Sequence, residues 1–239
     1  MSVNRIEIKK RIMEVFDTIA TSYSYTRARG WEIVLKVVNN STQVICDVGS
    51  GPGQNTLLIL EKYSHIYAIC IDVSLKMLMI SRKRVMKKGH HNSTDFIQAD
   101  MESLPLRSEA MDSMLYIASI HHIPTFEGRR RAVEEIHRCL KYGGKTLITV
   151  WAFPQPRFIK YIIRNILVKL SRSKYLESIR DVYIPWRFKG RKLLRYYHLF
   201  TLRELVSLVK SADLKIIEKG VYNIHSKIYP ENYYVVITK

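Results

Sequence analysis

A glycine-rich turn between a strand-like run and a helix-like run is the feature that most constrains how this chain folds. Residues 44–48 are mostly apolar, as in a buried strand, and residues 54–62 repeat apolar side chains with a helical period. The string that joins them is Asp47-Val-Gly-Ser-Gly-Pro-Gly53. Such glycines let the backbone turn tightly and approach a ligand at the carboxyl edge of a parallel sheet. The sequence therefore predicts a ligand site beside a doubly wound sheet.

The alternation of strand and helix patterns continues on both sides of this turn. Further core strands are expected at 66–71, 95–98, 112–118 and 145–151. Helices are expected at 5–20, 31–38, 75–87 and 129–140, the last of them ended by Gly143-Gly144. The segment 201–239 predicts a helix and then strands at 214–221 and 233–238. The predicted fold is α/β, with a doubly wound, mostly parallel seven-stranded sheet and N-terminal helices over one end.

Positive charge is concentrated in one segment after the fifth strand. The chain has 39 Lys and Arg against 21 Asp and Glu, a net charge of +18. Residues 155–200 hold 12 of these cations against Glu177 and Asp181, which favours a polyanion or an anionic membrane surface as partner. We expect one domain, 1–239, made of a helical cap (1–43), a cofactor-binding core (44–152), a basic substrate-binding insertion (153–200) and a closing helix with two strands (201–239).

Several classes of protein are disfavoured by the composition. No stretch of about 18 uncharged apolar residues predicts a membrane span, and residues 1–11 lack the apolar core of a secretory signal. Neither adjacent His pair has a thiolate or carboxylate at metal-ligand spacing, so no metal is expected. The odd number of cysteines, each among apolar residues, fits buried thiols in a reducing compartment: Cys46, Cys70 and Cys139. We therefore expect a cytoplasmic protein without membrane insertion.

The glycine spacing separates this turn from a dinucleotide fingerprint. Its pattern is G-x-G-x-G rather than G-x-G-x-x-G, which disfavours hydride chemistry with NAD. Asp72 ends the second strand and Asp100 follows the third, and the whole arrangement resembles class I S-adenosylmethionine-dependent methyltransferases. The resemblance implies that Asp72 accepts the ribose hydroxyls and that Asp100 and Met101 hold the adenine. The implied cofactor-binding residues are Asp47, Gly49, Gly51, Gly53, Asp72, Val73, Asp100, Met101 and Ile117.

Each carboxylate also has a simpler interpretation. Asp72 is compatible with a cap of the helix that starts near Ser74, and Asp100 with the start of a turn. The two interpretations stay open for each residue taken singly.

Further strings resemble one methyltransferase family over nearly the whole chain. The family is that of the tRNA wobble-uridine carboxymethyl methyltransferases, including the methyltransferase domain of the AlkB-homologue fusion protein. The strings are Val15-Phe-Asp-Thr-Ile-Ala20 with Thr26-Arg27 and Trp31, Ile120-His-His122 with Arg129-Arg130, Val150-Trp-Ala152, Ile184-Pro-Trp186, Arg195-Tyr-Tyr-His-Leu-Phe200 and Asn232-Tyr-Tyr234. The chain departs from the family pattern at Ser22, at Arg29-Gly30 and at Tyr233.

This resemblance implies that the acceptor is a carboxymethyl group on carbon 5 of the wobble uridine and that the product is its methyl ester. A carboxylate with a pKa of about 4 is already ionised, so the site must orient it rather than deprotonate it. Arg27 and His122 are the candidate catalytic residues, with Arg195 or His198 completing a clamp on the carboxylate. The candidate substrate-binding residues are His121, Trp151, Trp186, Arg195, Tyr197 and His198, with the two tryptophans as stacking surfaces for the base. Trp151 and Tyr197 are also compatible with simple packing.

The resemblance implies two partners, and two other functions stay open. The partners are the anticodon loop of tRNA, bound by the basic insertion, and a small zinc-binding activator subunit at the expected edge strand 94–98. The first alternative is a membrane-surface methyltransferase acting on a quinone or lipid precursor, suggested by the apolar, cationic stretch 158–170. The second is an inert tRNA- and cofactor-binding protein, suggested by the departures at Ser22 and Gly30.

Overall fold

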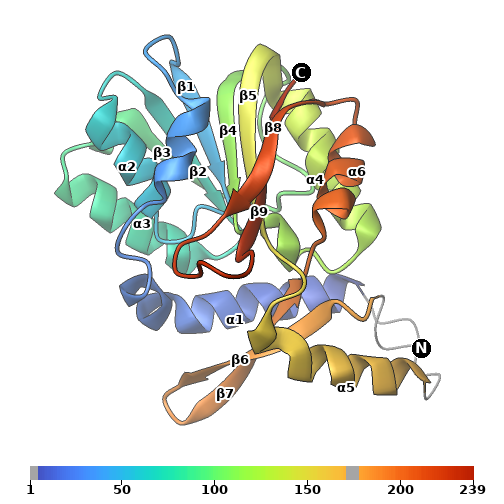
Figure 1. Cartoon of the computed structure of the whole chain (residues 1–239). Helices are drawn as coiled ribbons and strands as arrows, with labels where there is room; N and C mark the ends of the chain where they lie inside the picture. The colour runs from blue at the N-terminus through green and yellow to red at the C-terminus, as the bar shows by residue number, and fades with distance from the viewer. Residues whose placement is uncertain (1–4, 171–177) are drawn as a thin grey trace.

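A seven-stranded sheet forms the centre of the molecule in a computed structural model that describes residues 5–170 and 178–239 (Figure 1). The strand order is β3-β2-β1-β4-β5-β9-β8. The five strands from β3 to β5 are parallel, whereas β9 is antiparallel to both β5 and β8. The predicted fold class is therefore confirmed. The strands are β1 (Val44–Val48), β2 (Tyr67–Asp72), β3 (Thr94–Gln98), β4 (Met111–Ile117), β5 (Leu140–Trp151), β8 (Lys215–Tyr222) and β9 (Asn232–Thr238).

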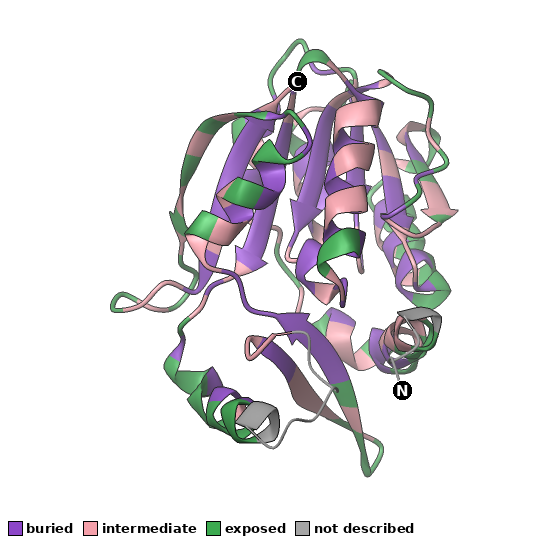
Figure 2. Cartoon of the chain, turned by 90° about the vertical axis from the view of Figure 1, so that its right-hand side faces the viewer, coloured by how far each residue is buried: buried purple, intermediate pink, exposed green. Residues whose placement is uncertain are grey.

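Two apolar cores lie on the two faces of this sheet. Helices α4 (Phe126–Cys139) and α6 (Leu202–Lys210) bury their apolar stripes on one face. Helices α2 (Gln54–Lys62) and α3 (Leu75–Lys87) and the 3₁₀ helix η1 (Glu32–Val37) cover the other face. Figure 2 shows the central strands as almost entirely buried, whereas the edge strands β8 and β3 are largely exposed or intermediate. Burial on both faces explains why the central strands are continuous apolar runs rather than alternating ones.

Helix boundaries follow capping residues, and these account for most differences from the predicted ranges. Thr125 caps α4, where its Oγ1 accepts a hydrogen bond from Gly128 N at 3.0 Å, so this helix starts three residues before the predicted position. The predicted end at Gly143-Gly144 is wrong, because α4 ends at Cys139 and β5 begins at the next residue. The glycines instead lie in an irregularity of β5, where Gly143 has φ 74° and the pairing with β4 shifts register.

Helix α1 (Arg5–Tyr25) runs along the carboxyl edge of the sheet and continues beyond the predicted end at residue 20. Figure 1 shows it between the sheet and the insertion. The insertion consists of α5 (Ile159–Leu170) and a separate antiparallel hairpin of β6 (Asp181–Phe188) and β7 (Arg191–His198). The charged residues Arg172, Lys174 and Glu177 lie outside the described residues. Across the described ranges, none of the helices has the length and apolar character needed to cross a membrane.

A buried polar cluster fastens the hairpin to the core. His198 lies between two carboxylates, with Nδ1 2.7 Å from Asp181 Oδ1 and Nε2 2.8 Å from Glu204 Oε1. The Tyr196 hydroxyl donates to Asp181 Oδ1 at 2.8 Å and also contacts the carbonyl of Pro124. Since these partners come from β6, β7, α6 and the loop before α4, the cluster fixes the hairpin beside the carboxyl edge of the sheet.

Candidate active site

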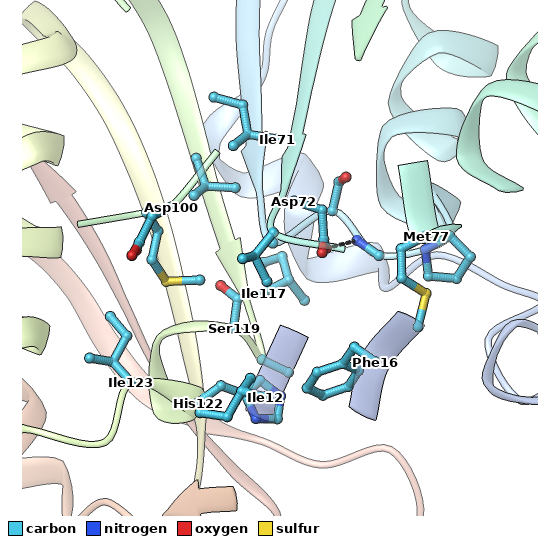
Figure 3. A pocket seen from close by; sticks show the side chains of 18 of the residues that line it. Ile12, Phe16, Ile71, Asp72, Met77, Asp100, Ile117, Ser119, His122 and Ile123 are labelled. Atoms are coloured by element: carbon cyan, nitrogen blue, oxygen red, sulfur yellow. Dashed lines mark hydrogen bonds between the residues drawn. The ribbon is translucent and has the colours of Figure 1, made fainter. Parts of the chain in front are cut away.

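One pocket lies where the carboxyl ends of β1, β2 and β4 meet helix α1 (Figure 3). We name two sides of this pocket the cofactor wall and the substrate wall and define each by its residues. The cofactor wall consists of residues 49–52, Gln54, Asp72, Val73, Asp100, Met101 and Ile117. The substrate wall consists of Phe16, Tyr23, Arg27 and His122. In Figure 3, Asp72 and Asp100 lie above the cavity and Phe16 and His122 lie below it.

The glycine turn is held in a conformation that other residues resist. Gly49 has φ 72°, and a Cβ placed on it would lie 2.4 Å from Cβ of Ser119. The amide of Gly49 donates to the carbonyl of Ile71 at 2.7 Å. Asp72 completes the turn, because its Oδ2 accepts from Gly51 N and its Oδ1 from Ser74 N, each at 2.8 Å. Asp72 therefore supports the turn and lines the pocket, whereas the cap of α3 is Ser74, whose hydroxyl accepts from Met77 N, and not Asp72.

Asp47 and Gly53 belong to the turn but do not line the pocket. Asp47 is buried, and its Oδ2 accepts from the Thr56 hydroxyl at 2.8 Å. Burial raises the pKa of Asp47 to about 7 and the pKa of Asp72 to about 6. Gly53 is the N-cap of α2 and has φ 76°. A Cβ on this residue would clash with Ser81. These two residues support the cofactor wall from behind.

The part of the cofactor wall expected to hold adenine includes a cation that sequence analysis missed. Lys9 of α1 places Nζ 2.5 Å from Asp100 Oδ2 and 2.6 Å from Glu102 Oε1. Lys9 precedes Asp100 by 91 residues, so nothing local in the sequence signals the contact. Helix α1 therefore closes this side of the pocket.

The walls fit a ligand that carries many polar groups. Three polar atoms of lining residues are buried and have no hydrogen-bond partner within residues 5–170 and 178–239: Ser50 Oγ, Gln54 Oε1 and Ser119 Oγ. Buried polar atoms of this kind are costly unless something bonds to them. An amino acid joined to a nucleoside, as in S-adenosylmethionine, supplies both donors and acceptors. Sequence analysis missed Gln54 and Ser119, which belong to no distinctive motif.

His122 presents a lone pair to the pocket rather than a proton. Its Nδ1 lies 2.9 Å from the carbonyl oxygen of Tyr196, which can only accept, so the ring proton is on Nδ1. Burial lowers the pKa of His122 to about 4, and the neighbouring charges of Arg195 and Arg27 act in the same direction. The imidazole is therefore neutral near pH 7 with a bare Nε2. Phe16 packs against it, with ring centroids 4.8 Å apart.

Arg27 lies at the mouth of the pocket, just beyond the end of α1. Its guanidinium lies 4.9 Å from the ring centroid of Tyr23, and Nη1 donates to the carbonyl of Thr26 at 3.2 Å. Among the described residues it makes no ion pair. Arg27 is thus a half-buried cation that faces the cavity without a carboxylate partner.

The other predicted substrate residues form a layer behind the pocket instead of lining it. His121 is fully buried, and its Nδ1 accepts from Trp151 N at 3.1 Å. Burial lowers its pKa far below the ordinary value. Trp151 stacks on Tyr197, with centroids 4.1 Å apart and planes at 4°, and on Phe158 as well. The ring faces predicted to receive a base are thus in contact with protein groups.

Arg195 and His198 were the two alternatives for completing the clamp on the carboxylate. Of these, Arg195 is the one that has a hydrogen-bond donor without a partner in the described parts of the chain. Both nitrogens of His198 are engaged by Asp181 and Glu204. Arg195 is buried, with its guanidinium 4.6 Å from the Trp186 ring and 5.3 Å from the Tyr197 ring. Its Nε has no hydrogen-bond partner within the described parts of the chain. Trp186 itself is tied to α1 through a bond from Nε1 to Ser22 Oγ at 3.0 Å.

Comparison with known proteins adds sequence relatives. The family model described as Methyltransferase domain matches residues 46–148. A Schizosaccharomyces pombe tRNA (carboxymethyluridine(34)-5-O)-methyltransferase is 30% identical over 87% of this chain and 90% of its own length. An Arabidopsis thaliana protein of the same name is 34% identical over 62% of this chain, and the mouse relative ALKBH8 is 30% identical over 72%. The matches span only 34% and 23% of those two longer relatives.

Solved structures show the same fold at lower identity. A Methanosarcina mazei SAM-dependent methyltransferase is 18% identical, with a TM-score of 0.69 over 88% of this chain and 98% of its own. A chain from the Haloferax volcanii complex of a methyltransferase with the Trm112 methyltransferase activator is 14% identical, with a TM-score of 0.65 over 95% of this chain and 96% of its own. At these identities the similarity concerns the fold alone.

Proposed function

We propose, from the premise that this chain belongs to the tRNA (carboxymethyluridine(34)-5-O)-methyltransferase family, that it methylates the carboxymethyl group on carbon 5 of the wobble uridine of tRNA. One observation carries the proposal. A single pocket joins a glycine turn and Asp72 on one side to Arg27 and His122 on the other. A binding site for a methyl donor and a cationic site for a carboxylate are thereby next to each other.

The cofactor wall would hold S-adenosylmethionine, which when bound supplies an activated methyl group. Asp72 would accept the ribose hydroxyls, and Asp100 with Met101 would hold the adenine. The oxygens of Gln54 and Ser119, which have no hydrogen-bond partner among the described residues, would bond the amino-acid end. Asp47 and Gly53 act from behind by fixing the turn and the start of α2.

The substrate wall would hold the acceptor carboxylate and exclude water. A carboxylate needs no general base, because its pKa of about 4 leaves it ionised at neutral pH. Arg27, which lines the pocket, is suited to bind it, and Arg195, in the layer behind, would supply a second guanidinium, since neither has a carboxylate partner among the described residues. His122 takes a different role from the one first expected. Its bare Nε2 is suited to accept the imide N–H of the uracil ring, which discriminates uracil from cytosine.

We also propose that the protein binds the tRNA anticodon loop and that it acts in the cytoplasm. The insertion carries the local excess of cations, and RNA binding by cations weakens steeply as salt rises. All three cysteines are buried and free, which is compatible with a reducing compartment. A small zinc-binding activator is proposed to pair with β3, which lies at one edge of the sheet.

The test of this function is methyl transfer from labelled S-adenosylmethionine into total tRNA from a strain that lacks the gene. The activator is co-expressed, and nucleoside mass spectrometry is the readout. The expected product is a methyl ester of carboxymethyluridine. Cofactor binding without label in any acceptor would instead favour an inert tRNA- and cofactor-binding protein.

One observation favours the membrane-surface alternative as a second candidate. Helix α5 exposes a continuous apolar stripe next to Lys160 and Arg164, as amphipathic membrane-surface helices do: Ile159, Ile163, Ile166 and Leu167. Flotation with anionic liposomes, in the presence and absence of competing tRNA, tests it. Label that enters a lipid extract and not tRNA would establish this candidate in place of the first.

A further inference from the structure

Aromatic rings and guanidinium groups alternate in a continuous ladder behind the substrate wall. Arg27 lies over Tyr23, and the Tyr23 ring is 5.7 Å from the Trp186 ring. Arg195 lies between Trp186 and Tyr197, at 4.6 and 5.3 Å from their centroids. These contacts connect the end of α1 to both strands of the hairpin. The hairpin thereby holds Arg27 and Arg195 in a fixed relation.

The ladder continues to a third arginine that has no assigned role. Tyr197 stacks on Trp151, and the guanidinium of Arg157 lies 4.8 Å from the centroid of Trp151. Arg157 also lies 4.6 Å from the ring of Phe158, within the short 3₁₀ helix η4 (Pro156–Phe158). Arg157 thus ends the ladder that Arg27 begins.

A buried glutamine fixes the orientation of Arg157. Its Nε donates to Gln155 Oε1 at 2.8 Å. The side chain of Gln155 is fully buried, and its Nε2 donates to the carbonyls of Ala152 and Glu231, each at 2.8 Å. A surface arginine ordinarily samples many rotamers, whereas this one is held by two rings and a bonded amide. The side chain is therefore pre-organised before any ligand arrives.

The positive charge of Arg157 is not neutralised locally. Its two terminal amino groups form no hydrogen bond or ion pair with a residue in the ranges 5–170 and 178–239. Glu231 is near, but its carboxylate accepts the backbone amides of Ile224 and His225 instead, at 2.5 and 2.8 Å. Burial lowers the pKa of Arg157; the nearby charge of Glu231 opposes this shift, and the charge of Arg27 adds to it. A fixed guanidinium with both amino groups free is suited to bidentate binding of an oxyanion.

We propose that Arg157 binds a backbone phosphate of the RNA segment that presents the acceptor uridine. The inference rests on the proposed function, in which Arg27 and Arg195 bind the acceptor carboxylate. The ladder holds three cations, and none of them is paired with a carboxylate in the described structure. An RNA loop likewise carries several anions close together, namely the acceptor carboxylate and the phosphates that flank it. Arg157 would thus make the site select a nucleotide within a chain over a free nucleoside.

The test uses the full chain with its activator and synthetic anticodon stem-loops that contain carboxymethyluridine. In these RNAs, one phosphate at a time next to the wobble position is replaced by an uncharged methylphosphonate. Arg157→Gln should raise KM for the normal RNA about fivefold to tenfold and reduce the salt slope of binding by about 0.7 to 1, with kcat unchanged. Arg157→Lys should recover part of the affinity. Arg107→Gln is the matched control, because Arg107 is an exposed arginine in the loop before β4, outside both the insertion and the lining of the pocket.

One methylphosphonate position should weaken the wild type and leave Arg157→Gln unaffected, and that non-additivity identifies the phosphate. Equal losses in wild type and variant at every position would overturn the proposal, as would an unchanged salt slope. If Arg157→Gln lowers the melting temperature and Arg157→Lys restores it without restoring the salt slope, the residue is structural and the proposal fails. Lack of methylation by the wild type is a separate outcome, which would instead refute the proposed function.

Discussion

The cofactor wall and the substrate wall face each other across one pocket but are built in different ways. On the cofactor wall, the bond from Gly51 to Asp72 joins residues only 21 positions apart, within one strand-turn-helix-strand unit. On the substrate side, the bond from Trp186 to Ser22 joins residues 164 positions apart. The first wall depends on backbone amides fixed by a local turn. The second depends on side chains that tertiary packing brings together.

The largest expected effect comes from removing a cation of the substrate wall. Arg27→Ala should lower kcat/KM for tRNA about 100-fold to 1000-fold, by analogy with the loss of other single charge-stabilising donors. The affinity for S-adenosylmethionine should not change, because the Arg27 side chain contacts Thr26 and Tyr23, and the backbone carbonyl that Arg84 bridges to Pro52 is kept in the variant. The measurements are steady-state methylation and calorimetric titration of the cofactor. Arg29→Ala is the control, since Arg29 is exposed close by. Equal losses for the two variants would mean that Arg27 has no specific role.

The second largest effect is expected on cofactor binding rather than on RNA binding. Asp72→Asn should weaken cofactor binding about 10-fold to 100-fold, because the amide cannot accept from both Gly51 N and Ser74 N as the carboxylate does. Binding of the RNA alone should stay as in the wild type. Asp213→Asn, at an exposed turn far from the pocket, is the matched control. Weaker RNA binding without weaker cofactor binding would contradict the separation of the two walls.

The two walls also differ in how far the sequence predicts them. The turn, Asp72 and the succession of strands and helices along the chain follow from local patterns, since period, glycine spacing and caps are properties of neighbouring residues. On the substrate side the resemblance suggested Arg27 and His122, which line the pocket, but not Phe16 and Tyr23 beside them. Nothing near Trp151 in the sequence indicates that Tyr197 would cover its ring, and nothing near Asp100 indicates Lys9. Contacts between distant segments are set by packing, which periodicity does not encode.

A smaller effect tests the point where the two walls meet. Gly49→Ala should lower the free energy of unfolding by about 2 to 3 kcal/mol, from the positive φ and from overpacking against Ser119. Ser119→Gly in the same chain should recover the part due to overpacking and leave the part due to φ. Urea denaturation of the three variants gives both numbers. Additive losses in the double variant would show that the two residues do not press on each other.

The smallest expected effect is a difference in pH dependence between the walls. His122 has a folded pKa of about 4, below its ordinary value of 6.5, so the unfolded chain binds more protons between these values and stability rises with pH. Asp47 has a folded pKa of about 7, above its ordinary value of 3.8, so its contribution is lost as pH rises through 7. Replacing each residue by Asn should therefore change the stability profile with opposite slopes, by about 1 to 2 kcal/mol between pH 5 and 6. Urea denaturation at both pH values measures the free energy of unfolding of each variant. Slopes of the same sign would show that burial does not shift the pKa values of His122 and Asp47 in opposite directions.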